Sequence, residues 1–284
     1  MAFCRLYVRY RGRVVERVVG VRLAARPVKG VGSADYHQPH VDLKDAIEAV
    51  RPAVVQLRDG NQNVVGTGFF IDEAGHVATA RHVVENQPSL LIGLAHPNTE
   101  NMRANFSLTG VEVIAEDKRH DLAILQMHAN PFKGEITSGI VIGNEQIDLL
   151  YGIATLDATR PNDGEPIAIS GYPLANPALV TTSGAIGSAW NYDVENMHVP
   201  GAPPGFTMPD IGDTYLADVQ ANPGNSGGPT YRLADAAIIG VCIQMRLSPT
   251  FDRTGATSDV ATNAGLTVVR PVRYLADLIV NAGI

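Results

Sequence analysis

The sequence predicts an all-β fold with two lobes, and three observations support this prediction. Short segments rich in Val, Ile and Leu recur along most of the 284 residues, and turn residues such as Asp-Gly separate them. Many short strands at this spacing indicate a barrel or a sandwich and argue against alternating strands and helices. The segments form two sets of similar size, with a polar segment containing Pro and Gly between them at residues 155–165.

The elements follow in order along the chain. A short helix is predicted at residues 43–50, with Asp42 as its N-cap and Pro52 ending it. The first set of strands comprises residues 54–57, 64–71, 76–80, 90–94, 111–114 and 122–127. The second set comprises residues 167–170, 179–182, 185–189, 215–219, 237–243 and 265–269. A final helix is predicted after Pro271, because four apolar residues follow it at helical spacing.

Composition excludes several classes of protein. The content of 45% hydrophobic and 18% charged residues suits a globular protein, and the net charge of -7 argues against nucleic acid as a partner. No apolar run approaches the roughly 18 residues of a membrane span. Two cysteines, Cys4 and Cys242, exclude a disulfide framework, and the apolar neighbours of Cys242 predict that it is buried. No signal peptide is visible, which makes the cytoplasm the default compartment.

The N-terminal segment differs from the rest of the chain. Residues 1–30 contain eight basic side chains and one acidic one, whereas the remainder has a net charge of -14. Residues 1–43 are therefore predicted to be a basic, flexible extension without a regular element. The expected organisation is this extension, a first lobe at residues 44–158 and a second lobe at residues 159–284.

The first candidate for chemistry is a serine among glycines. In the segment from Gly224 to Pro229, Ser226 is flanked by Gly-Asn and Gly-Gly. Such a turn can expose the hydroxyl and let neighbouring backbone N–H groups converge on one point, as an oxyanion in acyl transfer requires. Alone, the pattern is equally typical of a tight loop between strands.

A serine nucleophile needs a base, and the base needs a group that orients it. His82 follows a predicted strand directly, and Asp121 stands at the start of another apolar strand. A single histidine after a strand is more often structural, and an Asp in this place can simply face solvent. His120 is a competing neighbour of Asp121.

Together the three segments resemble the signatures of chymotrypsin-like serine peptidases, in that family's order of His, Asp and Ser. The segments are Thr79-Ala80-Arg81-His82, Asp121-Leu122-Ala123 and Gly224-Asn225-Ser226-Gly227-Gly228-Pro229. The resemblance implies two six-stranded antiparallel β-barrels and the catalytic triad His82, Asp121 and Ser226. It also implies an oxyanion hole at Gly224, Asn225 and Ser226, protein or peptide substrates, and neither a metal nor a cofactor.

Within that family, residues 44–281 are most similar to HtrA-like protease domains. The similarity rests on the segment from Ala46 to Val55, on Gly66-Thr67-Gly68-Phe69-Phe70-Ile71 and on the stretch from Thr181 to Ser188. It implies a role in protein quality control or regulation and the capacity to form a homo-oligomer. The chain is expected to lack the PDZ domain that many HtrA proteins carry. Gly171-Tyr172-Pro173 resembles instead the glutamyl endopeptidases, a sister group.

The resemblance also places the specificity pocket. Its floor falls on Gln220, and its wall on the strand that contains Cys242, Ile243 and Gln244. Because none of these side chains is charged, a basic P1 residue would be buried without a counter-ion, and we expect small or medium aliphatic P1 residues. Asn225 stands where trypsin-like zymogens have an Asp that binds a new N-terminal amine, so activation by cleavage is not expected.

Two other functions and one form of control stay open from the sequence. A catalytically silent or allosterically switched binding module could have the same fold, and an esterase could use the same triad. Residues 191–212 are rich in Pro and Gly and precede a strand that leads to the nucleophile. They are predicted to form a sensor or gating loop.

Overall fold

The structure is a computed structural model of the chain. It describes residues 2–10, 13–21, 43–95, 106–136, 140–142, 145–147, 149–176, 178–192, 213–251 and 257–284. The predicted N-cap Asp42 and residues 193–212 of the predicted gating loop lie outside these ranges. No helix in the described ranges has the length and apolar character needed to cross a membrane.

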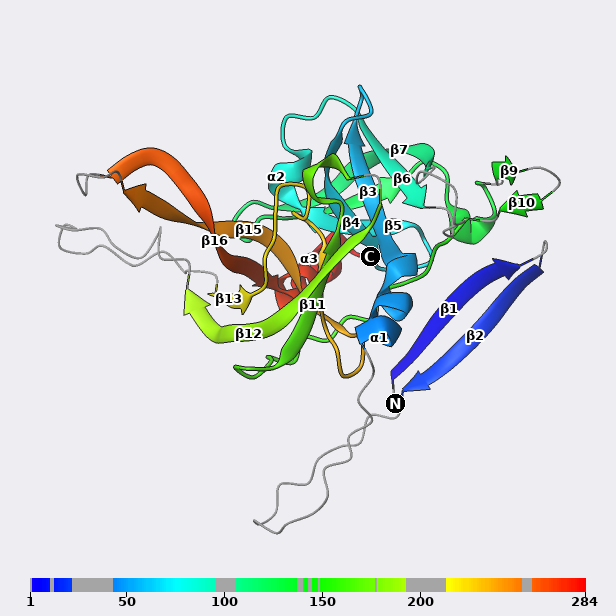
Figure 1. Cartoon of the computed structure of the whole chain (residues 1–284). Helices are drawn as coiled ribbons and strands as arrows, with labels where there is room; N and C mark the ends of the chain where they lie inside the picture. The colour runs from blue at the N-terminus through cyan, green and yellow to red at the C-terminus, as the bar shows by residue number, and fades with distance from the viewer. Residues whose placement is uncertain are drawn as a thin grey trace, which may run out of the picture.

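Two closed six-stranded barrels form the body of the protein (Figure 1). The strands of the first barrel are β3 (Val54–Asp59), β4 (Val64–Phe70), β5 (His76–Ala80), β6 (Leu90–Ala95), β7 (Phe106–Asp117) and β8 (Leu122–Met127). Those of the second are β11 (Pro166–Gly171), β12 (Val180–Tyr192), β13 (Asp213–Asp218), β14 (Pro229–Arg232), β15 (Ile238–Phe251) and β16 (Thr257–Pro271). Neighbouring strands are antiparallel throughout both barrels. The predicted fold class is confirmed.

The first barrel matches the predicted strands closely. All six predicted segments are strands, and the order around the barrel is β3-β4-β5-β8-β7-β6. Because β5 pairs with β8, Ala80 lies opposite Leu122. The residues that follow β5 and precede β8 therefore meet at one end of the barrel.

The second barrel departs from the prediction at two strands. The predicted segments 179–182 and 185–189 fall, from Val180 on, in the single strand β12, which runs through Gly184. A Cβ at Gly184 would lie 2.0 Å from the carbonyl oxygen of Asp218 on β13, so this glycine permits a close approach of two backbones. Strand β14 was not predicted, because its first residue, Pro229, follows two glycines that indicate a loop.

In the described part of the chain, three helices accompany the barrels. Helix α1 (Leu43–Val50) and helix α3 (Val272–Ala282) lie where the sequence predicts helices, and the four-residue helix α2 (Arg81–Val84) follows β5. Three short 3-10 turns also occur, η1 (Arg51–Ala53), η2 (Pro131–Lys133) and η3 (Pro173–Ala175).

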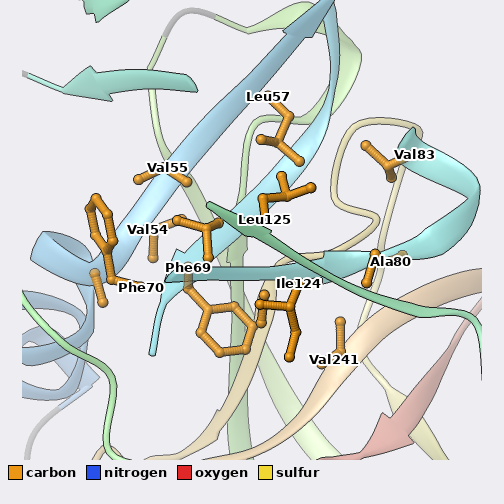
Figure 2. Packing of buried hydrophobic residues seen from close by; sticks show 14 of the residues in the cluster. Val54, Val55, Leu57, Phe69, Phe70, Ala80, Val83, Ile124, Leu125 and Val241 are labelled. Carbon is orange, nitrogen blue, oxygen red and sulfur yellow. The ribbon is translucent and has the colours of Figure 1, made fainter. Parts of the chain in front are cut away.

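One hydrophobic cluster joins the two barrels. It contains the interior of the first barrel together with residues of the second barrel, including Val241 of β15, and of helix α3, including Leu275 and Leu278. Figure 2 shows Val241 among the side chains of the first barrel, near Ile124 and Ala80. A second cluster fills the interior of the other barrel. The boundary between the lobes is therefore a packed apolar interface.

The linker between the barrels is held by one arginine. Arg232 of β14 forms ion pairs with Asp157 and with Asp235. Burial alone would raise the pKa of Asp157, but hydrogen bonds from Arg232 and Thr159, together with the charge of Arg232, outweigh burial and lower that pKa. The Asp157 N–H also donates to the Ile238 carbonyl at 2.9 Å. The polar segment that the sequence indicates as a linker is thus fixed to the second barrel where it begins.

Two small sheets lie outside the barrels. Strands β1 (Ala2–Tyr10) and β2 (Arg13–Val21) form a hairpin in the N-terminal segment, where the sequence analysis expected no regular element. Five valines in β2 explain the difference, because β-branched residues favour strands and the basic residues among them obscure the pattern. Strands β9 (Ile140–Ile142) and β10 (Glu145–Ile147) form a second, shorter pair.

Candidate active site

His82 lies on helix α2, directly after β5, and Asp121 directly precedes β8. The pairing of these strands brings the two residues together. His82 Nδ1 is 2.6 Å from Asp121 Oδ2, and the His82 backbone N–H donates to Asp121 Oδ1 at 2.9 Å. One carboxylate thus holds both the ring and the backbone of the histidine. With a proton on Nδ1 directed at Asp121, Nε2 is left as the acceptor that a general base needs.

The turn before β8 places Asp121 in a left-handed conformation, with φ of 57°. Asp tolerates this region better than most residues. The competing histidine is engaged elsewhere, because His120 Nδ1 lies 2.5 Å from Asp117 Oδ2 and its ring stacks on Tyr274. Arg270 Nε donates to the His120 carbonyl at 2.9 Å. Contacts on both sides therefore fix the turn that presents Asp121.

We call residues 224–228, which contain Ser226, the nucleophile loop. The first backbone N–H in this loop that donates no hydrogen bond to a described residue is that of Gly224. The Pro223 carbonyl accepts a hydrogen bond from the Leu174 N–H at 2.7 Å. Because C=O and N–H point in opposite directions in a trans peptide, the Gly224 N–H points away from Leu174. Leu174 lies in turn η3 with φ of 54°, a costly conformation for leucine that its surroundings must maintain.

The second free amide belongs to Ser226. The Asn225 carbonyl accepts from the Gly228 N–H at 2.9 Å, which directs the Ser226 N–H to the opposite side. Within the described residues, neither the Gly224 nor the Ser226 N–H donates a hydrogen bond. Two unoccupied donors two residues apart on one tight loop are what an oxyanion requires.

The remaining amides of the loop are occupied. The Asn225 N–H donates to the Asn222 carbonyl at 3.0 Å, and the Gly227 N–H donates to the Cys242 carbonyl at 2.7 Å. Asn225 was predicted as part of the oxyanion hole, but it contributes no free amide. Its side chain is 3% exposed, which places it inside the fold beneath the loop.

Two glycines are required for this loop geometry. Gly224 has φ of 101°, and a Cβ there would lie 2.4 Å from the Tyr172 carbonyl oxygen. Gly227 has φ of 83°, and a Cβ there would lie 2.1 Å from the Thr67 carbonyl oxygen. Any side chain at either position would combine backbone strain with a clash against a rigid main chain.

The side chains of Ser226 and His82 are not hydrogen-bonded to each other among the described residues. Among the described residues, the Ser226 hydroxyl has no hydrogen bond to the His82 ring, whose side chain is 43% exposed. Contacts of this kind often tighten only when substrate binds. The catalytic roles of His82, Asp121 and Ser226 therefore stay predictions from the sequence, and the geometry described here supports them.

The predicted pocket residues have different environments. Gln220 and Gln244 are exposed, whereas Ile243 is buried. Cys242 is 1% exposed in the core of the second barrel, and burial raises the pKa of its thiol to about 12. The thiol of Cys242 is thus a packing group, and only its backbone reaches the nucleophile loop.

Side-chain donors hold the backbone at the predicted pocket floor. Three successive carbonyls, those of residues 219, 220 and 221, each accept one such hydrogen bond. The donors are Thr267 Oγ1, Thr182 Oγ1 and Asn263 Nδ2. The floor is therefore fixed by its backbone, and of its three side chains only that of Gln220 is exposed, while Val219 and Ala221 pack in the core of the second barrel.

Two residues that shape the site were not predicted from the sequence, Thr67 and Leu174. The available signal for Thr67 was a hydroxyl between two glycines inside a strand, and Leu174 had none. In the part of the chain that the structure describes, no group of three His, Cys, Asp or Glu side chains could hold a metal ion.

The double barrel and the paired His82 and Asp121 beside a loop with free amides form the arrangement that is typical of chymotrypsin-like serine peptidases. A family model described as a trypsin-like peptidase domain matches residues 66–241, which is more than half of the chain. The chain belongs to this family. The resemblance stated from the sequence is confirmed.

Several relatives found by sequence are named as serine proteases of the HtrA and DegP type. The chain is 26% identical over 204 residues to a probable periplasmic DegP-like serine endoprotease of Halomonas elongata, covering 72% of this chain and 33% of that protein. It is 26% identical over 208 residues to the serine protease HTRA1 of Xenopus laevis, covering 70% and 37%. The chain thus spans about a third of the length of these relatives.

Solved structures share the fold at low sequence identity. The inactive form of the Rv3671c protease from M. tuberculosis has a TM-score of 0.56 at 19% identity, covering 90% of this chain and 100% of that one. The HtrA-type protease AlgW, solved with a decapeptide, has a TM-score of 0.56 at 15% identity, covering 85% and 67%.

Proposed function

We propose that this chain is an HtrA-like serine endopeptidase that cleaves protein substrates through an acyl-enzyme. The observation that carries the proposal is the arrangement of residues 224–228, where, within the described part of the chain, the N–H groups of Gly224 and Ser226 donate no hydrogen bond and the other three N–H groups do. The two free donors lie on either side of an occupied one on the same turn, which is the arrangement that an oxyanion requires.

The reaction begins at the hydroxyl of Ser226. His82 Nε2 accepts the proton of Ser226 Oγ while this oxygen attacks the carbonyl carbon of the scissile peptide. Asp121 holds the proton on Nδ1 and stabilises the imidazolium that forms. The tetrahedral oxygen accepts hydrogen bonds from the two free amides, and each such donor contributes about 10²–10³-fold to the rate in enzymes of this kind.

The second half of the reaction reverses these roles. The protonated His82 donates its proton to the leaving amine, so the peptide bond breaks and the acyl group stays on Ser226. The same histidine then accepts a proton from water as the water oxygen attacks the ester carbonyl. It returns this proton to Ser226 Oγ when the acyl C–O bond breaks, which releases the acid and restores the free enzyme. Every step uses groups that this chain supplies.

The test is labelling with a fluorophosphonate probe, comparing the wild type with Ser226→Ala. We expect the wild type to be labelled and to hydrolyse peptides, and the variant to do neither, because the probe reacts with an activated serine. A folded wild type that takes no label would contradict the proposal and favour the silent or switched binding module. Labelling without peptide cleavage would favour the esterase.

The proposed function also leads to a prediction about which residue at P1 of the substrate is preferred. Because Gln220 is exposed and uncharged, we expect peptides with Ala or Val at P1 to exceed those with Lys or Glu in kcat/KM by about 10-fold or more. A panel of peptides that differ only at P1 measures this. The variant Gln220→Asp should raise the rate with Lys, and the highest wild-type rate with Lys or Glu would show that the pocket is placed wrongly.

A further inference from the structure

Thr67 of β4 belongs to the first barrel, but its contacts reach the nucleophile loop of the second barrel. Its side chain is fully buried, with 0% exposure. The Thr67 hydroxyl donates to the Gly224 carbonyl at 2.6 Å and accepts from the Tyr172 N–H at 3.0 Å. Since a backbone N–H can only donate, the single hydroxyl proton is committed to Gly224.

The backbone of Thr67 makes a second contact with the same loop. Its N–H donates to the Ser226 carbonyl at 2.9 Å, and its own carbonyl accepts from Thr79 Oγ1 at 2.8 Å. Thr67 therefore binds the carbonyls of Gly224 and Ser226, the two residues whose N–H groups are free. No other residue in the described ranges donates to both.

The peptide between residues 224 and 225 lies between the two free amides. A rotation about ψ of Gly224 that is not cancelled at φ of Asn225 would change the direction of the Gly224 N–H relative to that of the Ser226 N–H. Two hydrogen bonds hold this peptide, one from the Thr67 hydroxyl to the Gly224 carbonyl and one from the Asn225 N–H to the Asn222 carbonyl. Gly224 has no Cβ, so its own conformational preference opposes this rotation only weakly. The hydrogen bond from the Thr67 hydroxyl is the side-chain contact that opposes it directly.

We propose that Thr67 is a positioning residue, whose hydroxyl orients the peptide after Gly224 and so sets the direction of the two oxyanion donors from across the barrel interface. This inference rests on the proposed peptidase function. Thr67 is fully buried, so it acts through the loop and not on the substrate. The effect is expected on the transition state, in which the oxyanion exists, and not on substrate binding.

The test compares Thr67→Val, which keeps the shape and loses the hydroxyl, with Thr67→Ser, which keeps the hydroxyl. We expect the Val variant to lose about 10- to 100-fold in kcat with KM within about 2-fold of the wild type, since each oxyanion donor is worth about that much or more. The Ser variant should recover most of the rate. The acid limb of the pH profile should not move, because the pair of His82 and Asp121 is not touched.

A matched control separates positioning from a general loss of packing. Tyr231 is also 0% exposed, and its hydroxyl contacts Ser170 Oγ at 2.9 Å, not the nucleophile loop. Tyr231→Phe removes one buried hydroxyl without a change of shape, and kcat should stay within about 2-fold of the wild type. Should Thr67→Val fail to fold, Thr67→Ser and Thr67→Ala form a second pair that differs only in the hydroxyl.

The outcomes distinguish this inference from the proposed function. A wild type that neither hydrolyses peptide nor takes the fluorophosphonate label overturns both. An active wild type with an equally active Thr67→Val overturns the inference alone. Equal losses in Thr67→Val and Thr67→Ser, in folded protein, also overturn it, because a hydroxyl at this position would then not be enough to restore the rate. A loss in kcat that the Ser variant restores supports it.

Discussion

Replacing Asp121 by Asn is expected to lower kcat by about 10⁴-fold, the size of loss that the same change causes in the triad template of this class. The geometry of the pair explains why. Asp121 uses one oxygen for the His82 N–H and the other for Nδ1, so both positions require an acceptor. An amide offers one acceptor and one donor. If the amide oxygen accepts from the His82 backbone N–H, the amide NH₂ faces Nδ1 of the His82 ring. Because this NH₂ needs an acceptor, Nδ1 is then unprotonated and the ring proton is on Nε2.

The wrong tautomer cannot accept the proton of Ser226, and the loss should appear in kcat measured with a peptide substrate at neutral pH. Asp72 supplies a matched control, because it also binds a histidine through backbone N–H and Nδ1, at 3.1 Å and 2.5 Å from His76. The variant Asp72→Asn should keep kcat within about 2-fold of the wild type, since His76 lies outside the proposed site. An Asp121→Asn enzyme with more than a tenth of wild-type kcat would remove Asp121 from the triad.

Replacing Asp213 by Asn is expected to lower the free energy of unfolding by about 3–5 kcal/mol, the cost of breaking a buried ion pair from one side. The Asp213 side chain is 5% exposed and forms ion pairs with Arg160 and Arg273. Tyr274 also donates to its carboxylate at 2.6 Å. Without the carboxylate, two neighbouring guanidinium groups lose their common counter-ion. Urea unfolding measures the change.

The same variant tests the dependence of stability on pH. Burial acts to raise the pKa of Asp213, but hydrogen bonds from Tyr274 and Arg160 and the nearby positive charges outweigh it and lower the pKa. A carboxyl with a lowered pKa stabilises the fold above its unfolded pKa of about 4, and this stability is lost as pH falls. The difference between wild type and Asp213→Asn should therefore shrink below about pH 4.

The control for this prediction lies at the other end of the same strand. Asp218 is the last residue of β13 and is exposed. Asp218→Asn should change the free energy of unfolding by less than about 0.5 kcal/mol. If Asp213→Asn changed the free energy of unfolding by an equally small amount, the prediction would be wrong. Solvent and aromatic rings would then stabilise the two arginines enough to replace the lost ion pairs.

Much of the fold could be predicted because its signals are local. Each strand of the first barrel has its own run of β-branched or apolar residues between turn residues, and all six were found. In the second barrel, Gly184 and Pro229 gave misleading local signals. A glycine that admits a neighbouring backbone and a proline that opens a strand both look like turn residues when only the sequence is considered.

In the candidate site, too, residues in local motifs could be predicted and residues that depend on long-range contacts could not. His82, Asp121 and Ser226 each lie in a short motif, so the sequence identified them without knowledge of the fold. The contact between Thr67 and Gly224 joins residues 157 positions apart, and no periodicity or spacing encodes it. Cys242 was predicted both as a core residue and as a pocket residue. The structure places its thiol in the core, because which face of a strand points inward depends on the register of the barrel.

The first barrel depends for part of its core on helix α3, which is synthesised last among the described elements. This helix follows the last strand of the second barrel, yet Val272, Leu275 and Leu278 complete the apolar cluster of the first. Arg270, just before the helix, reaches back 150 residues to the turn that presents Asp121. A nascent chain that has released only its first half therefore lacks part of its core. Contacts so distant in sequence form slowly. We therefore expect the two barrels to become stable together, so that a partly synthesised chain does not yet have an assembled site.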